Sequence, residues 1–195
     1  RAQPRRPPPP PPPGPGPPGP RGAGPAARAG GGSAALYADF DTLVGSDYMR
    51  RLQDETGAVL MGRRTFDGAE DPDSYAEDYE FQAPIFVVTH RPLPVAPRRN
   101  ERLWIEFVTD GVEEAVRRAV EAAGDRDVTF VGGADLFRQL LAADLVDELA
   151  VDVMPVLLGG GVRLFDGGVP ATLEKVSVDE VGVRTALRYR VVRDR

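Results

Sequence analysis

Hydrophobic positions follow two different periods along the chain from residue 36 onward. Short apolar runs flanked by Gly or Pro are typical of buried strands. They occur at residues 58–62, 84–90, 104–108, 128–131 and 148–154. Apolar residues recur at helical spacing in other stretches, at residues 47–55, 112–123 and 135–142. Two further strands, 173–178 and 183–192, close the pattern.

This alternation of strands with helices predicts an α/β fold. Such a pattern builds a mainly parallel sheet with helices on both faces, which is a three-layer α/β/α arrangement. In the last predicted strand, apolar residues alternate with arginines, as in a strand with one solvated face. We therefore expect the closing two strands to form an antiparallel pair at the edge of the sheet.

Several segments fit this pattern less well. Residues 36–46 alternate apolar and polar side chains, which indicates either a short half-buried strand or a loop that leads into the next helix. Asp47 is expected to cap that helix and Gly57 to end it. The acidic, turn-rich residues 67–82 are predicted to form a surface excursion, and residues 91–100, with three prolines, a loop.

The first 35 residues differ in composition from the rest. They hold 13 of the 20 prolines and eight of the 22 glycines, so they cannot bury a core. We expect an extended polyproline segment followed by a flexible one, that is, a disordered tail. The alternative is a tail that serves as a ligand for SH3-like partners. Residues 36–195 are then expected to form one domain.

Charge and residue usage exclude several classes of function. The tail carries five Arg and no acid, so residues 36–195 hold 19 basic and 30 acidic residues, a net charge of −11. This acidic balance argues against nucleic acid as a partner. With no apolar run long enough to span a membrane and no secretory signal, the sequence predicts a cytoplasmic protein without a membrane partner. With no Cys and one His, we expect no disulfide, no metal site and no Ser-His-Asp triad.

The candidate chemistry lies where three of the predicted strands end. Sheets of parallel strands bind ligands outside the carboxyl ends of the strands. Residues 62–65, 89–91 and 132–135 follow such ends and supply helix N-terminal amides, guanidinium groups and a hydroxyl. Three anion-binding junctions along one edge suit a long, multiply charged ligand. A dinucleotide phosphate cofactor has that shape and charge.

Each of these junctions also has a simpler explanation. Gly132 and Gly133 alone suit a tight strand-to-helix turn. Arg63 and Arg64 alone suit a solvated surface, and His90 suits an ordinary loop. The later Gly-Gly-Gly run lacks the Gly-Lys-Ser/Thr ending of a phosphate-binding loop, so we interpret it as a flexible turn.

Four longer motifs resemble a known family. They are AVLMGRRTF, PIFVVTHRP, VTFVGGADLFRQLLAADLVDEL and VMPVLLGGGVRLFDG. In order and spacing they resemble the dihydrofolate-reductase-like superfamily. Within it they are most similar to the reductase domain of the bacterial bifunctional riboflavin-biosynthesis deaminase/reductase, the RibD C-terminal domain. The resemblance covers residues 45–192.

The resemblance implies a dihydrofolate reductase-like fold that binds NADPH along the sheet edge. It implies that the Gly-Arg-x-Thr turn holds cofactor phosphates and that the next strand end selects the adenosine 2′-phosphate. It also implies that the pyrophosphate and nicotinamide ribose pass over the glycine pair. The implied cofactor-binding residues are Gly62, Arg63, Arg64, Thr65, Thr89, His90, Arg91, Gly132, Gly133, Ala134, Asp135, Leu136 and Phe137.

The best-known reaction of this family reduces the ribose of a phosphoribosylamino-pyrimidine to a ribityl chain. The resemblance therefore implies an NADPH-dependent oxidoreductase similar to 5-amino-6-(5-phosphoribosylamino)uracil reductase, acting on a small-molecule substrate. The sequence carries no zinc signature of a deaminase, so we expect no deaminase domain in it. No catalytic residue is assigned, and Asp47 is expected to be either the helix cap or a substrate-facing carboxylate. Relatives are often dimers, which makes a homodimer a candidate assembly.

One feature departs from the family pattern. Relatives begin with a strand and a Ser-Leu-Asp-Gly-type turn, which supply a central strand of the sheet. The Pro/Gly-rich tail stands in that place here, so the first strand is expected to be missing. Its loss would leave two neighbouring strands with unpaired backbone groups. The alternative to an active reductase is therefore a non-catalytic, cofactor-binding or dimerising relic of the family.

Overall fold

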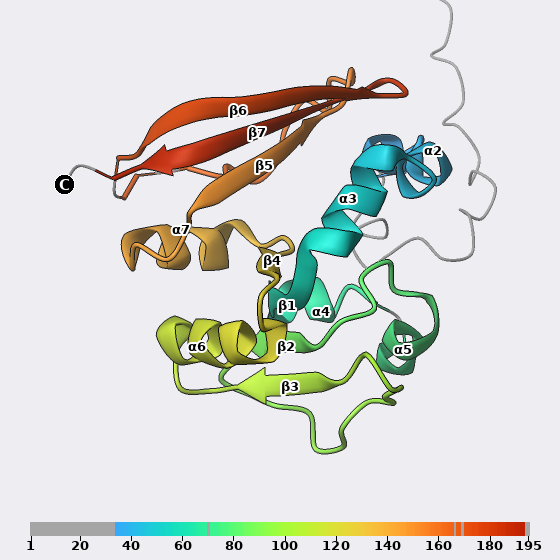
Figure 1. Cartoon of the computed structure of the whole chain (residues 1–195), viewed down its shortest axis with the longest axis vertical. Coiled ribbons are helices and arrows are strands. Elements are labelled where there is room, and N and C mark those ends of the chain that lie inside the picture. Colours follow the sequence, from blue (N-terminus) through green and yellow to red (C-terminus); the bar gives the residue numbers. More distant parts are fainter. Residues whose placement is uncertain (1–33, 70, 166, 169, 194–195) are drawn as a thin grey trace, which may run out of the picture.

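The computed structural model describes residues 34–69, 71–165, 167–168 and 170–193 (Figure 1). The expectations for the tail and for the missing first strand fall largely on residues 1–33, which lie outside this described part. The first elements in chain order are η2 (Ala34–Tyr37), α2 (Phe40–Val44), α3 (Asp47–Glu55), β1 (Thr56–Gly62), α4 (Arg63–Phe66), η3 (Pro72–Ser74), α5 (Tyr75–Asp78) and β2 (Ile85–Val88). They are followed by β3 (Ile105–Val108), α6 (Val112–Ala123), β4 (Asp127–Phe130), α7 (Ala134–Ala142), β5 (Glu148–Val153), β6 (Thr172–Val181) and β7 (Arg184–Val192).

Four strands form a parallel sheet in the order β3-β2-β1-β4. In register, Val59 of β1 lies opposite Ile85 of β2 on one side and Thr129 of β4 on the other. β1 is an uninterrupted apolar run, and Ala58, Val59, Leu60 and Met61 are at most 1% exposed. Such a run is what a central strand covered on both faces requires.

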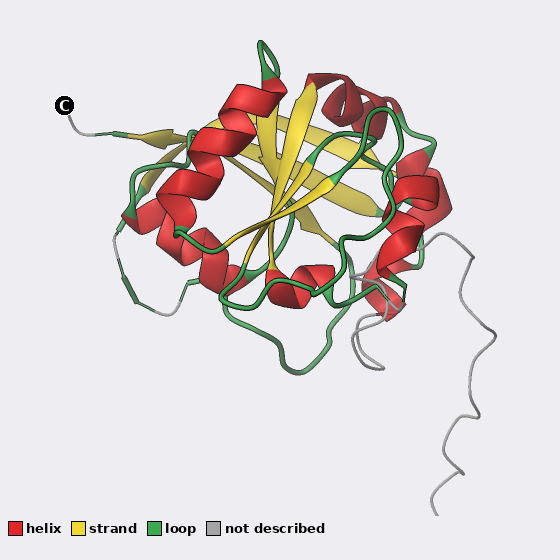
Figure 2. Ribbon diagram, turned by 90° about the horizontal axis from the view of Figure 1, so that it is seen from below, coloured by secondary structure: helices red, strands yellow, loops and turns green. Residues whose placement is uncertain are grey.

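Alternate residues of β1 enter two separate hydrophobic layers. Val59 and Met61 pack with residues of α2, α3, α4 and α5, whereas Ala58 and Leu60 pack with α6 and α7. Figure 2 shows helices on both sides of the strands. The predicted α/β fold with a three-layer arrangement is therefore confirmed.

The remaining three strands form an antiparallel sheet in the order β5-β7-β6. The predicted antiparallel pair corresponds to β6 and β7, but it forms a separate sheet with β5 and does not extend the edge of the parallel sheet as expected. Leu149 lies opposite Tyr189 and Val151 opposite Leu187, so the period of two in all three strands gives one apolar face. In Figure 1 the antiparallel sheet lies at the top and the parallel sheet below it, so the two sheets are arranged one after the other along the long axis of the molecule.

The interpretation of residues 36–46 as a strand is wrong. The 3₁₀-helix η2 and the short helix α2 occupy this segment, so the alternative of a connection into the next helix is closer to the structure. Phe40 and Leu43, three residues apart, are the buried side chains of α2. A spacing of three places both side chains on one face of a helix. The alternation of Leu36, Ala38 and Phe40 therefore did not indicate a strand.

The prediction of a surface excursion at residues 67–82 is wrong in part. Tyr75, Tyr79 and Phe81 are at most 6% exposed and pack in the layer that contains Val59 and Met61. Their rings meet edge-on in succession, with Tyr75 and Tyr79 centroids 5.1 Å apart and Tyr79 and Phe81 centroids 5.9 Å apart. The acidic residues between them obscured an aromatic cluster that covers one face of the sheet.

Two predicted helix-boundary residues have other positions. The side chain of Ser46 caps α3 by accepting a hydrogen bond from the Met49 amide at 3.1 Å, so Asp47 lies one residue inside the helix. Gly57 does not end the helix but lies buried in β1. A Cβ at Gly57 would lie 2.6 Å from the carbonyl oxygen of Ala123, so the close approach of α6 explains this glycine.

Each sheet has two edge strands within the described residues, β3 and β4 in the parallel sheet and β5 and β6 in the antiparallel sheet. β4 pairs there with β1 alone, and β5 pairs with β7 alone. The chain runs from β4 through α7 to β5, so one edge strand of each sheet stands at either end of a single connection. No helix of the described part is long and apolar enough to cross a membrane.

Candidate cofactor-binding site

The parallel register brings the three predicted junctions to one edge of the sheet. Gly62 at the end of β1 lies opposite Val88 at the end of β2. On the other side of β1, the Val131 amide donates to the Leu60 carbonyl at 2.9 Å, so Gly132 follows at the same level. The turns after β1, β2 and β4 are therefore neighbours.

The strand order reverses direction between β1 and β4. From β1 the chain continues outward to β2 and β3, then returns to place β4 on the other side of β1. The connections after β1 and β4 thus leave in opposite directions, so the strand order reverses here, and sheets of this kind bind ligands at such a switch point. Gly62 and Gly132 stand on the two sides of this switch point.

Thr65 of α4 lies close to the glycine pair at this switch point. A Cβ at Gly132 would lie 3.3 Å from Thr65 Oγ1, and a Cβ at Gly133 would lie 3.5 Å from it. Both glycines also have positive φ, 71° and 93°, which L side chains rarely adopt. The backbone here is therefore bare, strained for any other residue, and close to a hydroxyl group.

The N-terminus of α7 opens from the same glycine pair. Gly133 is its N-cap and supplies no side-chain hydrogen bond to the first amides. Its carbonyl accepts from the Phe137 amide at 3.0 Å. The uncapped amides of the first turn are donors for an anion, although Asp135 places one acidic side chain in the same turn.

Leu136 and Phe137 contribute only backbone to this edge. Their side chains are 5% and 3% exposed and pack in the interior. Of these two predicted site residues, only the backbone amides therefore lie where a ligand at this edge could meet them. The helical period explains this, because positions three and four of α7 turn toward the core.

Arg63 connects two of the junctions. Its Nε donates to Asp67 Oδ1 at 2.7 Å, and its Nη1 donates to the carbonyl of Arg91 beyond β2. The guanidinium also lies 6.0 Å from the ring centroid of Phe107 in β3. Arg63 therefore fixes the shape of the edge, whereas its neighbour Arg64 is exposed.

The turn after β2 is held by its own threonine. Thr89 Oγ1 accepts from the Arg91 amide at 3.1 Å and donates to the Arg91 carbonyl at 3.2 Å. Thr89 is 8% exposed, whereas His90 and Arg91 are exposed. The threonine thus shapes the turn, and the two basic side chains are the groups free to meet a ligand.

The sequence interpretation missed a fourth junction, after β3. The Thr89 amide donates to the Val108 carbonyl at 3.0 Å, so Thr109 and Asp110 lie beside Thr89 and His90. Asp110 forms an ion pair with Arg118 of α6 at 3.3 Å. The sequence did indicate this junction, because residues 104–108 were predicted to be a strand and residue 112 to begin a helix.

Asp47 lies in the first turn of α3 with a side chain that is 82% exposed. Its carboxylate is paired with Arg50 one turn later. This contact explains Asp47 as a helix-stabilising acid near an N-terminus. The structure thus leaves no catalytic acid or base assigned.

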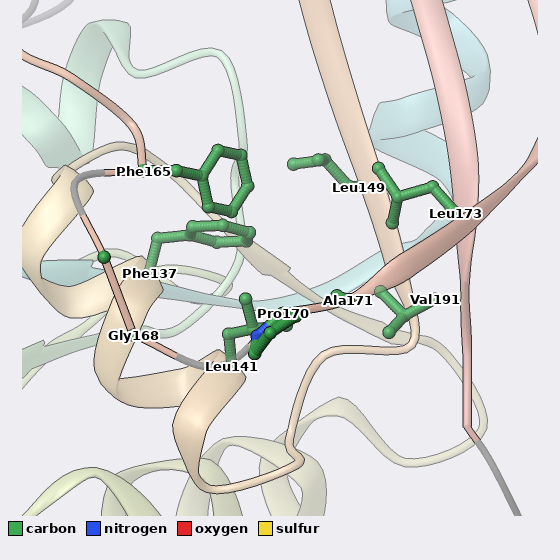
Figure 3. Close-up of a pocket in the computed structure, with 10 residues that line it drawn as sticks. Phe137, Leu141, Leu149, Phe165, Gly168, Pro170, Ala171, Leu173 and Val191 are labelled. Carbon is green, nitrogen blue, oxygen red and sulfur yellow. The ribbon is translucent and has the colours of Figure 1, made fainter.

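A separate cavity of about 380 Å³ lies between α7 and the antiparallel sheet (Figure 3). The sticks in Figure 3 show apolar side chains from both sides turned toward it, including Phe137 and Leu141 from α7 and Leu149 from β5. Phe165 closes one side and meets Phe137 edge-on, with centroids 5.6 Å apart. Its apolar lining does not suit a multiply charged cofactor.

The fold and the edge together define an α/β protein whose parallel sheet gathers a bare glycine pair, a helix N-terminus and exposed basic side chains at its carboxyl end. The comparisons with known proteins go further. The model of the RibD C-terminal domain matches residues 24–187, and the chain belongs to this family. The resemblance inferred from the four motifs is thereby confirmed.

Known relatives are distant. Among curated proteins, the chain is 26% identical over 110 residues to the uncharacterised protein YwjB of Bacillus subtilis, covering 55% of this chain and 57% of that one. The chain spans about three fifths of the length of the curated relatives it matches. Activity of a whole relative is therefore not shown for it.

Solved structures show the same fold. A putative riboflavin biosynthesis protein from Shewanella sp. PV-4 matches with a TM-score of 0.59 and 22% identity, over 76% of this chain and 81% of that one. A diaminohydroxyphosphoribosylaminopyrimidine deaminase/5-amino-6-(5-phosphoribosylamino)uracil reductase from Thermotoga maritima matches with a TM-score of 0.50 and 17% identity, over 74% of this chain and 48% of that one. These likenesses establish the fold alone.

Proposed function

We propose that this chain is an NADPH-dependent reductase that acts on a phosphoribosylamino-pyrimidine. The observation that carries the proposal is the switch point between β1 and β4, where Thr65 lies close to the bare backbone of Gly132 and Gly133. Membership in the RibD C-terminal domain family supports the same reading. The substrate class is proposed from the function named for the Thermotoga protein.

The residues at this edge fit a dinucleotide phosphate. The uncapped first turn of α7 would receive the pyrophosphate, because helix N-termini bind anions. The Thr65 hydroxyl would donate to the same group. The exposed side chains of Arg64, His90 and Arg91 would face the adenosine 2′-phosphate.

When bound, the cofactor supplies the hydride. The protein binds and orients both reactants, which is how a site without an assigned acid or base accelerates a reaction. Arg63 has a positioning role, because its contacts to Asp67 and to the Arg91 carbonyl hold the junctions after β1 and β2 together. The alternative proposal, a cofactor-binding relic without turnover, is motivated by the open edges of β4 and β5.

The test uses Arg64→Glu, since substitution of Gly133 would strain the turn whatever binds there. NADPH binding is titrated by cofactor fluorescence, with Arg126→Glu as the control. Arg126 is an exposed arginine that precedes the amino end of β4, at the opposite edge of the sheet. Arg64→Glu is expected to weaken binding by roughly tenfold or more through lost and reversed charge, whereas Arg126→Glu leaves it unchanged.

The outcomes separate the proposals. Binding together with oxidation of NADPH in the presence of a phosphoribosylamino-pyrimidine supports the reductase. Binding without oxidation against this and a panel of other carbonyl substrates supports the relic. If NADPH does not bind to a chain that melts cooperatively, both proposals are wrong.

A further inference from the structure

Helix α7 carries two apolar stripes that face different parts of the molecule. Leu136 and Leu140 are at most 5% exposed and pack in the layer that contains α6 and one face of β1. Phe137 and Leu141 each follow one residue later, so they lie along a second side of the helix. That second side meets the antiparallel sheet without filling the space between them, and the cavity of about 380 Å³ in Figure 3 remains there.

The antiparallel sheet contributes only apolar side chains to this cavity. The strand residues that line it are Leu149, Leu173 and Val191. Each has a charged neighbour in its own strand, and these neighbours pair with one another: Arg190 lies 3.6 Å from both Glu148 and Glu174. Because successive residues of a strand point to opposite faces, the three charges lie on the other side of the sheet.

This lining excludes charged and strongly polar ligands. Among the described residues around the cavity, none has a charged or polar side chain. A charged group placed there would lose its hydration without gaining a partner. Water is a poor occupant as well, since a buried water needs about two to four polar partners.

The size of the cavity and its aromatic wall define the ligand further. An engineered cavity of about 150 Å³ in another protein holds benzene, so this larger cavity has room for roughly two fused rings. Phe137 and Phe165 meet at its wall with ring planes 78° apart, an arrangement that offers both a ring face and a ring edge to an aromatic ligand. Phe165 is 49% exposed and Leu173 is 37% exposed, so the cavity is accessible from solvent.

The chain itself has few side chains to place there. Residues 1–33 contain no Val, Ile, Leu, Met, Phe, Tyr or Trp, so that segment has no large apolar side chain for the cavity. The most exposed apolar residue near the cavity in sequence is Leu157, in the loop after β5, and it does not line the cavity. A small molecule is therefore the occupant that the lining fits best.

We propose that the cavity between α7 and the antiparallel sheet is a binding site for a neutral aromatic molecule of roughly two fused rings. The site is separate from the anion-binding edge, although both use α7. Phe137 shows the division, because its amide donates to the Gly133 carbonyl at that edge whereas its ring lines the cavity. The proposal does not depend on cofactor binding.

The first test is a fluorescence titration of the full chain with N-phenylnaphthylamine, a neutral aromatic probe whose emission rises in apolar surroundings. Saturable binding is expected. Its sulfonated form, anilinonaphthalene sulfonate, has the same rings and a negative charge, and is expected to bind roughly tenfold more weakly or worse. The absence of saturable binding, or equal affinity for the two probes, would overturn the proposal.

Two variants test whether the probe lies in the cavity. Leu173→Glu introduces a carboxylate into the lining, and Ala171→Trp fills the cavity without adding a charge. Each is expected to weaken binding of N-phenylnaphthylamine roughly tenfold or more. Both positions are exposed, and circular dichroism with thermal melting shows whether the fold is kept. Leu157→Glu is the matched control for Leu173→Glu, and its affinity for the probe is expected to equal that of the wild type.

The remaining outcomes separate this site from other surfaces. Wild-type affinity in both lining variants would overturn the proposal. Tighter probe binding by Leu157→Glu would show that Leu157 of a second copy occupies the cavity, and would overturn it as well. Displacement of the probe by NADP⁺ would place it at the cofactor edge and have the same consequence. The titrations contain no cofactor, so a failure of NADPH to bind would contradict the proposed function and leave this site standing.

Discussion

Arg184 and Asp39 form an ion pair in which both side chains are more than nine-tenths buried. Arg184 Nη2 donates to Asp39 Oδ1 at 2.8 Å, and its Nη1 donates to Asp152 at 2.8 Å. The side chains are 6% and 8% exposed, and 145 residues separate them in the chain. The pair holds the segment before α2 onto β7, and thereby fixes the helices that cover this face of the antiparallel sheet.

Replacement of Arg184 by Met is expected to destabilise the fold by about 3–5 kcal/mol, because it leaves the Asp39 carboxylate buried without its partner. Urea unfolding followed by circular dichroism measures the change. The control is Arg117→Met, which removes a surface ion pair with Glu114 in α6. A midpoint for Arg184→Met that equals that of the control would contradict this account.

Gly57→Ala is expected to destabilise the protein by about 1–3 kcal/mol, as overpacking of a tight core does. The new Cβ would lie 2.6 Å from the Ala123 carbonyl, and backbone at the end of α6 cannot move aside as a flexible side chain can. Gly160→Ala is the matched control, since a Cβ there has nothing within 4 Å. Thermal melting compares them, and similar midpoints for the two variants would disprove the close approach.

Apolar periodicity predicted the parallel half of the fold well. The helix expected at residues 112–123 is α6 with the same bounds, because its stripe faces β1, β2 and β4 and ends at Gly124. The junctions after β1, β2 and β4 were also predictable, since strand ends adjacent to helix starts follow from the same pattern. Their meeting at one edge follows from the parallel register.

Other features depend on contacts between distant residues and leave no local pattern. The Arg184–Asp39 pair joins positions 145 residues apart, and no pattern in either segment predicts a contact with the other. The close approach of Gly57 to Ala123 likewise could not be predicted from the sequence. The usual preference for glycine at helix ends instead led us to place Gly57 at the end of a helix. Tyr75 and Tyr79 were obscured because acidic neighbours made a buried aromatic cluster resemble a surface loop.

Thr65→Val is expected to lower the affinity for NADPH about tenfold, because it removes one hydroxyl hydrogen bond to a charged group. Valine keeps the shape of threonine, so the contact with Gly132 and the melting temperature are expected to be unchanged. Within the described residues, the Thr65 hydroxyl makes no hydrogen bond that valine would lose. Calorimetric titration gives the affinity, and an unaltered dissociation constant would remove Thr65 from the cofactor site.

Glu80 is expected to make stability fall as the pH rises. Burial raises the pKa of its carboxyl group, and Oε2 is buried without a hydrogen-bond partner. A raised pKa in the folded state means that the contribution of Glu80 is fully present below its ordinary pKa of 4.5 and is lost as pH rises through the folded value. The free energy of unfolding of Glu80→Gln, relative to that of the wild type, is therefore expected to be about 1 kcal/mol higher at neutral pH than at acidic pH.

Urea unfolding of wild type and Glu80→Gln at a series of pH values measures this difference. Glu77→Gln is the control, because Glu77 in the same region has a side chain that is 63% exposed. Its stability difference from wild type is expected to vary little with pH. A constant difference for Glu80→Gln across the series would show that its carboxylate is solvated.

The open edges of β4 and β5 predict alternating hydrogen exchange along each strand. The Val131 amide donates to Leu60 of β1, so the preceding amide, that of Phe130, points toward the open edge. In β5, the bond from Val191 to Asp147 places Val151 toward β7 and Ala150 outward. We expect Phe130 and Ala150 to exchange faster than Val131 and Val151 in amide-resolved NMR. Equal protection within each pair would show that the outward amides of β4 and β5 are hydrogen-bonded, and would contradict the open edges.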